Sequence, residues 1–326
     1  MRDIKIDTLR GLACIFLVAY HVIGNNPSNG LHIESGFLRE INDLLETVRM
    51  PLFTFLSGMV YAYRPLSGNW SKFLKGKARR LLIPMLVVGT LFAIIQALVP
   101  GTNNKIDNWW LLHIYPVQHF WFVEALFWVF IFIIPLELNR LLNNRLVTVL
   151  IIAAFLALAV GQPYTKLLAF KGFIYLTPFF LFGMSIVRFE ISPLPILPSL
   201  LGFVGIMAAI YFLTDGVYGR SLLGCVIGMF SCYFLLGLKL SSTWLARIGI
   251  YSYSIYIFHV FFTAGARIVA NKLFSVSDEA NFVIGLVTGI VGPIVVFLFA
   301  QKLPLGSLLL LGEKGKKKLF NREVVG

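Results

Sequence analysis

The first apolar segment of the chain carries Asp7, Arg10 and His21. At ~100° per residue, Arg10 and His21 lie within ~20° of each other around a helix, and Asp7 lies within ~40° of His21. The eleven residues from Arg10 to His21 span ~16 Å along a helix. If Arg10 lies at the membrane surface, His21 lies near the middle of a ~30 Å hydrocarbon layer. An ionisable residue at that depth is costly, which indicates a functional site.

This spacing suits a substrate whose charged end and reactive end are far apart. The planar guanidinium of Arg10 suits an anionic group such as a phosphate, and Asp7 either orients Arg10 or caps the helix start. A histidine further along the same face can act as a general base. Acyl-coenzyme A has this shape. Because the membrane interior disfavours charge, it favours the neutral imidazole that a base needs.

The elements that hold these residues are predicted from composition and hydropathy. Of the 326 residues, 58% are hydrophobic and 13% are charged, whereas soluble domains contain ~25% charged residues. We therefore predict an all-α polytopic membrane protein with a bundle of about ten transmembrane helices, the first of them retained and not a signal peptide. The predicted spans are 8–24, 47–63, 81–99, 119–136, 146–161, 172–187, 198–214, 221–238, 248–270 and 282–303.

The net charge of +13 is explained by membrane topology, because of where the basic residues lie, and it does not indicate nucleic-acid binding. Nineteen Lys and Arg residues fall on one side of the predicted membrane, so the positive-inside rule places both termini in the cytoplasm. The opposite side has eight: Arg39, Arg49, Lys105, Lys166, Lys171, Arg220, Arg267 and Lys272. Residues 1–310 are predicted to form a single transmembrane domain, and residues 311–326 a basic cytoplasmic tail that contacts anionic lipid.

Further polar residues lie in or near other predicted spans. Ser57 and Gly58 fall at mid-depth in the second span, and Gly58 would admit a neighbouring helix or a ligand. His119, Trp121 and Glu124 open the fourth span, and His259 lies in the ninth at a depth similar to that of His21. Hydrogen bonding between helices is the alternative role for each, and for Tyr251, Tyr253 and Tyr256. Cys14, Cys225 and Cys232 have no metal-ligand spacing, so no metal site is predicted.

At five places in order along the chain, the sequence resembles the acyltransferase-3 family of bacterial membrane acyltransferases. The matching segments are Asp7-Thr8-Leu9-Arg10-Gly11 with His21, Phe55-Leu56-Ser57-Gly58 with Arg64, Lys77-Ala78-Arg79-Arg80 with Pro84, His119-Phe120-Trp121-Phe122, and Gly249, Ser252, Tyr253, Ser254, Tyr256 and His259. The chain departs from the family pattern at Val123-Glu124, so the role of Glu124 stays open.

The resemblance implies an acyl-CoA-dependent O-acetyltransferase of the bacterial inner membrane that modifies a cell-envelope polysaccharide such as O-antigen or exopolysaccharide. The acyl group, most often acetyl, would pass from cytoplasmic acyl-CoA, a substrate and not a bound cofactor, to a glycan or lipid-linked glycan hydroxyl. In the expected mechanism Arg10 holds the coenzyme phosphates, and His21 either deprotonates the acceptor or carries the acyl group itself. The expected catalytic residues are His21, Glu124 and His259.

The remaining candidates are expected to bind substrate: Asp7, Arg10, Ser57, Arg64, Arg80, His119, Trp121 and Tyr253. Among them Ser57, Arg64 or Tyr253 would stabilise the oxyanion or position the donor. Glu124 would bind acceptor hydroxyls or pair with His119. The alternative function is a transporter or flippase of an envelope glycan or lipid, because midplane ionisable residues also mark transport pathways. A transporter would often show inverted repeats, and the first-span motif has no counterpart in predicted spans six to eight.

Overall fold

The computed structural model describes residues 3–99, 108–160, 165–213, 221–273 and 276–314, and these residues form helices without a β-sheet. The helices are α1 (Ile4–Ile23), α2 (Phe37–Leu44), α3 (Glu46–Tyr63), α4 (Trp70–Leu98), α5 (Trp121–Leu138), α6 (Arg145–Val160), α7 (Phe170–Arg188), α8 (Ile196–Leu213), α9 (Leu222–Gly237), α10 (Thr243–Ile250), α11 (Ser252–Leu273), α12 (Asp278–Ala300) and α13 (Pro304–Leu311). Short 3-10 turns are η1 (Trp109–Leu111), η2 (Gln118–Phe120), η3 (Leu141–Asn143) and η4 (Leu167–Ala169).

The all-α class predicted from hydropathy is confirmed. Six of the described helices are long and apolar enough to cross a membrane, and they are α1, α4, α5 with η2, α7 with η4, α11 and α12. The apolar helices α6, α8 and α9 are shorter. The chain is therefore a multi-pass membrane protein, while the count of ten spans and the cytoplasmic placement of the termini remain predictions. Residues 315–326 of the predicted tail lie outside the described residues.

Two helices differ in extent from the predicted spans. The span at 248–270 is divided at Tyr251 into α10 and α11, because α10 packs closely against α1. Hydropathy is continuous across this break and could not reveal it. The basic segment before the third span is largely helical, since α4 begins at Trp70, where the Asn69 side chain accepts a hydrogen bond from the backbone N–H of Lys72 at 3.0 Å.

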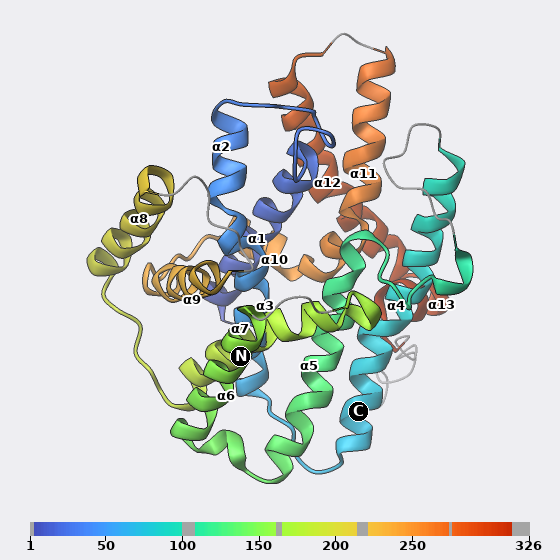
Figure 1. Ribbon diagram of the computed structural model, residues 1–326. Coiled ribbons are helices and arrows are strands. Elements are labelled where there is room, and N and C mark those ends of the chain that lie inside the picture. Colours follow the sequence, from blue (N-terminus) through green and yellow to red (C-terminus); the bar gives the residue numbers. More distant parts are fainter. Residues whose placement is uncertain (1–2, 100–107, 161–164, 214–220, 274–275, 315–326) are drawn as a thin grey trace, which may run out of the picture.

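The bundle has two ends, and α1 runs from one toward the other (Figure 1). We call the end formed by the C-terminal parts of α1 and α11 and by α2 the His21 end, and it lies at the top of the view. The opposite end is the Asp7 end, and it includes the start of α1, which packs against α10, and, lower in the view, the α3–α4 and α5–α6 connections. The His21 end corresponds to the side predicted to face outward.

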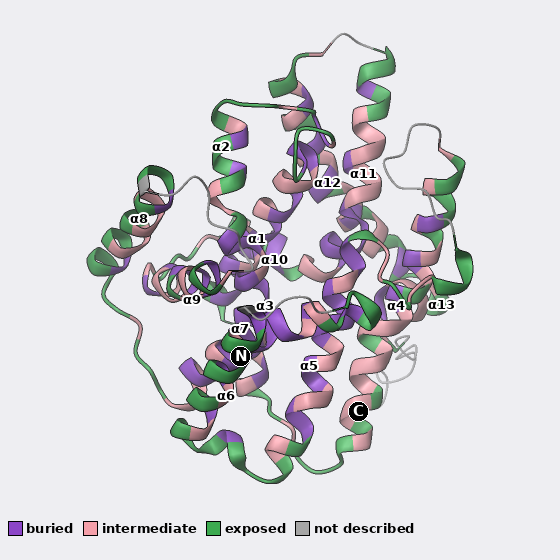
Figure 2. Ribbon diagram, viewed as in Figure 1, coloured by how far each residue is buried: buried purple, intermediate pink, exposed green. Residues whose placement is uncertain are grey.

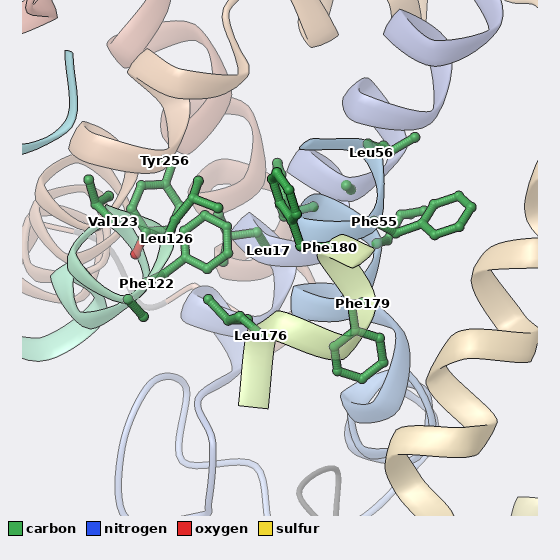
Figure 3. Close-up of a cluster of buried hydrophobic side chains, with 14 of the residues drawn as sticks. Leu17, Phe55, Leu56, Phe122, Val123, Leu126, Leu176, Phe179, Phe180 and Tyr256 are labelled. Carbon is green, nitrogen blue, oxygen red and sulfur yellow. The ribbon is translucent and has the colours of Figure 1, made fainter. Parts of the chain in front are cut away.

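The core lies where α1, α3, α5, α7 and α11 meet, and buried residues concentrate there in Figure 2 while α8 is largely exposed. Phe55, Phe179 and Phe180 are fully buried at the contact between α3 and α7. Figure 3 shows Phe122 and Tyr256 side by side, and their ring centroids are 5.1 Å apart. This packing holds α5, which carries Trp121, against α11, which carries His259, and His119 lies in η2 directly before α5.

Two glycine pairs allow the closest helix contacts. A Cβ atom at Gly58 would lie 1.9 Å from the Phe180 carbonyl oxygen, and one at Gly183 would lie 2.0 Å from the Phe55 carbonyl oxygen. At the α1–α10 contact, a Cβ at Gly249 would lie 1.9 Å from the Asp7 carbonyl oxygen, and one at Gly11 would lie 2.0 Å from the Leu245 carbonyl oxygen. In each case the obstacle is backbone, which cannot move aside. Gly58 therefore admits a helix, one of the two roles predicted for it.

We expect Gly58→Val to lose at least ~3 kcal/mol of stability, because the added side chain overpacks the α3–α7 contact. The matched control is Gly205→Ala in α8, where an added Cβ meets nothing within 4 Å. Thermal unfolding in detergent, followed by size-exclusion chromatography, measures both. If the two variants unfolded at the wild-type temperature, the α3–α7 contact would not be as close as described.

Candidate active site

Three histidines from three helices meet at the His21 end. We call His21 of α1, His119 of η2 and His259 of α11 the histidine cluster. The ring centroids of His21 and His259 are 4.7 Å apart, those of His119 and His259 are 5.0 Å apart, and those of His21 and His119 are 5.8 Å apart. The structure thus brings together three sequence-predicted candidates that are far apart in the chain.

Backbone contacts hold the cluster in place. The Nδ1 atom of His259 lies 2.8 Å from the Ile255 carbonyl oxygen and 2.9 Å from that of Tyr256. If Nδ1 carries the proton, Nε2 is left as an acceptor, and it is buried without a hydrogen-bond partner among the described residues. The Tyr256 hydroxyl donates to the His119 carbonyl oxygen and thereby ties α11 to η2. The Nδ1 atom of His119 is likewise buried and unpaired within the described chain.

A cavity of about 700 Å³ reaches the cluster, and we call it the histidine cavity. Its lining includes His21, His119, Trp121, Tyr256 and the connection between α1 and α2, at Gly24–Asn26 and Ser28–Gly30. The volume falls within the ~300–1,000 Å³ range of small-molecule sites. Asparagine amides, hydroxyls and aromatic faces in one cavity can bind a polar, ring-shaped molecule beside His21.

Sequence reasoning did not select several residues of this cavity as site residues. Arg49 of α3 is buried, and its Nη1 atom donates to the Asn42 carbonyl oxygen at 2.6 Å and to the Asn42 Oδ1 atom at 2.9 Å. Its guanidinium carbon lies 4.2 Å from the centroid of the Tyr20 ring. Arg267 of α11 and Tyr175 of α7 also line the cavity. The signal available in the sequence was the presence of Arg49 and Arg267 on the side that is otherwise poor in basic residues.

Other predicted residues lie at the Asp7 end. The Nη1 atom of Arg10 is 3.3 Å from the Oδ1 atom of Asp7, an ion pair that is partly exposed on the arginine side. The Tyr253 hydroxyl donates to the Arg80 carbonyl oxygen at 2.5 Å, which joins α11 to α4. Arg64 is exposed where α3 ends. These residues are absent from the lining of the histidine cavity.

Ser57 and Glu124 are placed separately from both groups. The Ser57 hydroxyl donates to the Phe53 carbonyl oxygen at 2.8 Å within α3. The Oε2 atom of Glu124 is buried and makes no hydrogen bond to a described residue, so the expected pairing with His119 is not formed. Neither residue lines the histidine cavity.

A separate cavity of about 540 Å³ at the Asp7 end is basic, and we call it the basic cavity. Lys72, Lys75 and Arg79 of α4 line it together with Lys314, which follows α13. The Arg79 Nε atom donates to the Gly312 carbonyl oxygen at 3.1 Å and so attaches the end of α13 to α4. Cationic side chains grouped in this way can bind an anionic group.

A comparison with protein-family models matches residues 3–300 to the acyltransferase domain of the acyltransferase-3 family. No curated protein and no solved structure is similar enough to the chain to match it. The family match covers nearly all of the chain and includes every helix from α1 to α12. Together with the membrane-spanning helices, it makes the chain a membrane acyltransferase. The chain belongs to the acyltransferase-3 family.

Proposed function

We propose that this membrane acyltransferase transfers an acyl group, most simply acetyl, from acyl-CoA to a hydroxyl group of a cell-envelope glycan, and that it works in the bacterial inner membrane. The observation that carries the proposal is the histidine cluster beside a polar and aromatic cavity, opposite a basic end of the bundle. The two ends suit two substrates, a glycan at the His21 end and a polyphosphate-bearing thioester at the Asp7 end.

In the direct mechanism, the neutral His21 imidazole takes the proton from the acceptor hydroxyl. The oxygen forms a bond to the thioester carbonyl carbon, the carbon–sulfur bond breaks, and the coenzyme thiolate receives the proton from His21. In the alternative, a His21 ring nitrogen takes the acyl group first and passes it to the acceptor in a second step. The neighbouring rings of His119 and His259 orient His21 in both mechanisms.

The other candidates have roles that follow from where they lie. Arg10, oriented by Asp7, binds the coenzyme phosphates with Arg64 and Arg80 at the Asp7 end. Tyr253 positions this end by joining α11 to α4. Trp121 presents an aromatic face to the acceptor in the histidine cavity. Glu124 and Ser57 would have to change rotamer, or act through a neighbouring group, to reach the reacting atoms.

The proposal is tested by measuring free coenzyme A released from acetyl-CoA by purified protein in nanodiscs, with and without candidate envelope glycans. We expect release that depends on the glycan, together with acyl label on the glycan. If wild-type protein neither bound nor hydrolysed the donor with any glycan present, acyl transfer from CoA would be excluded. Transport is measured separately, with the protein reconstituted into closed lipid vesicles. A glycan that crosses the vesicle membrane without being acylated would support the transporter.

A further inference from the structure

A second cavity adjoins the histidine cavity and has no role in the reaction described above. It measures about 590 Å³ and is lined by the end of α4, the segment 108–121 and the start of α7. We call it the lysine cavity after Lys166 and Lys171. Gln118 and Trp121 line both cavities, so the two spaces adjoin at these two residues.

The basic residues of the predicted outer side concentrate at these two cavities. The positive-inside rule depletes Lys and Arg from that side. Of the six outer-side Lys and Arg residues that the structure describes, four line a cavity: Arg49 and Arg267 the histidine cavity, Lys166 and Lys171 the lysine cavity. Among the described lining residues, Glu46 alone is acidic, and it belongs to the histidine cavity. The pair of cavities therefore carries a net positive charge.

The cationic groups include some that the described chain does not neutralise. The Arg267 guanidinium makes no hydrogen bond or ion pair to a described residue, although the side chain is half-buried. The Lys166 ammonium is exposed and likewise unpaired within the described part of the chain. An unpaired cation in a cavity favours an anionic ligand, because that ligand supplies the missing counter-charge.

The wall between the cavities has the chemistry that sugars require. Trp121 is half-buried, and a Cβ atom added at Gly172 would lie 2.6 Å from its Cε3 atom, so Gly172 allows the indole to lie against α7. Tyr115, Gln96 and Asn108 add an aromatic ring and two amides to the lysine cavity. Aromatic faces pack on the apolar faces of sugar rings, while amides bind hydroxyls.

The backbone around the lysine cavity is held in an uncommon conformation. Gln118 and Ala169, which line it, have φ values of 47° and 52°, in the left-handed region that non-glycine residues seldom adopt. The adjacent Leu168 has a φ of 48°, and its N–H donates to the Ile114 carbonyl oxygen at 2.7 Å. Residues in this region are strained and persist where the surrounding structure holds them in place.

We infer that the lysine cavity is a binding subsite for an acidic sugar residue, one bearing a carboxylate or a phosphate, in an extended acceptor chain. This inference rests on the proposed glycan acceptor. One sugar of the acceptor offers its hydroxyl to His21 in the histidine cavity, and the oligosaccharide continues past Trp121 into the lysine cavity. The neighbouring acidic residue then pairs with Lys166 and Lys171. The acceptor is accordingly an anionic oligosaccharide or polysaccharide of at least two residues.

The test measures equilibrium binding to purified protein in nanodiscs without donor, by calorimetry and by tryptophan fluorescence. The probes are oligogalacturonates, glucuronate-containing oligosaccharides and phosphorylated oligosaccharides, each with one to four residues, against neutral maltooligosaccharides of the same lengths. We expect at least one acidic class to bind ten-fold or more tightly than the neutral class, with affinity that rises from one to two residues and falls steeply with salt.

The variant Lys166→Ala/Lys171→Ala should weaken binding of that acidic class about ten-fold and remove the gain from the second residue. Lys166→Arg should keep most of the affinity. Lys272→Ala, an exposed outer-side lysine that lines neither cavity, should leave it unchanged. If no acidic class bound more tightly than the neutral one, or if the double variant bound as wild type does, the subsite would be refuted. Acetyl-CoA is then added to the same protein with the acidic oligosaccharide that binds most tightly. If the oligosaccharide bound as expected but no coenzyme A were released, acyl transfer would be refuted and the subsite kept.

Discussion

His21→Ala should reduce acyl transfer at least ~100-fold, because a positioned general base contributes ~10²–10⁴-fold to a rate. The residue lines the histidine cavity, with its ring centroid 4.7 Å from that of His259 and 5.8 Å from that of His119. The loss should fall on kcat, while the KM for the donor stays near the wild-type value. Steady-state release of coenzyme A with saturating glycan measures both.

The matched control is His32→Asn. His32 is an exposed histidine in the connection between α1 and α2, and its φ of 58° is a conformation that asparagine tolerates. It should retain wild-type activity. If His21→Ala kept full transfer, His21 would be neither the base nor the acyl carrier, and His119 or His259 would become the candidate.

The same variant distinguishes direct transfer from an acyl-histidine intermediate. Wild-type protein is mixed with radiolabelled acetyl-CoA without acceptor and quenched within milliseconds to seconds. Label retained on wild type and absent from His21→Ala shows the covalent route. If wild-type protein carries no label before the glycan is added, yet acylates the glycan afterwards, transfer is direct.

The sequence was sufficient to predict the long apolar helices and one face of the site. The apolar stretches predicted helices that the structure contains, and helical periodicity placed Asp7, Arg10 and His21 on one face of α1. The meeting of His119 and His259 with His21 could not be predicted from spacing, because it depends on how η2 and α11 pack against α1. That packing is set by contacts such as Tyr256 with Phe122 and Gly249 with Asp7, which join distant parts of the chain.

The cavities were beyond sequence reasoning for a different reason. Arg49 counted only as a basic residue at the start of a span, yet it is buried against Tyr20 and Asn42. Its position depends on α2, a helix of eight residues that is too polar for the hydropathy analysis to detect. The break between α10 and α11 likewise leaves no trace in hydropathy. The position of Arg49 and the break between α10 and α11 depend on how distant segments pack, so they could be seen only in the structure.

Arg10→Ala should raise the KM for acyl-CoA about ten- to hundred-fold, because hydrogen bonds to charged groups contribute ~1.5–3 kcal/mol. The guanidinium is partly exposed at the Asp7 end and paired with Asp7 at 3.3 Å, where a phosphate can join or replace the carboxylate. Since Arg10 is ~16 Å from His21 along α1, kcat should change far less than KM. Steady-state kinetics over a range of donor concentrations separates the two parameters.

Lys5→Ala is the matched control, since it removes one exposed positive charge from the same end of α1. It should leave the KM for the donor unchanged, whereas Arg10→Lys should recover part of the loss, because an ammonium keeps the charge but not the planar pair of donors. A fall in kcat at constant KM would mean that Arg10 stabilises the helix start through Asp7 and does not bind donor. The coenzyme phosphates would then have to bind elsewhere at this end, and the basic cavity lined by Lys72, Lys75 and Arg79 is the place that the structure offers.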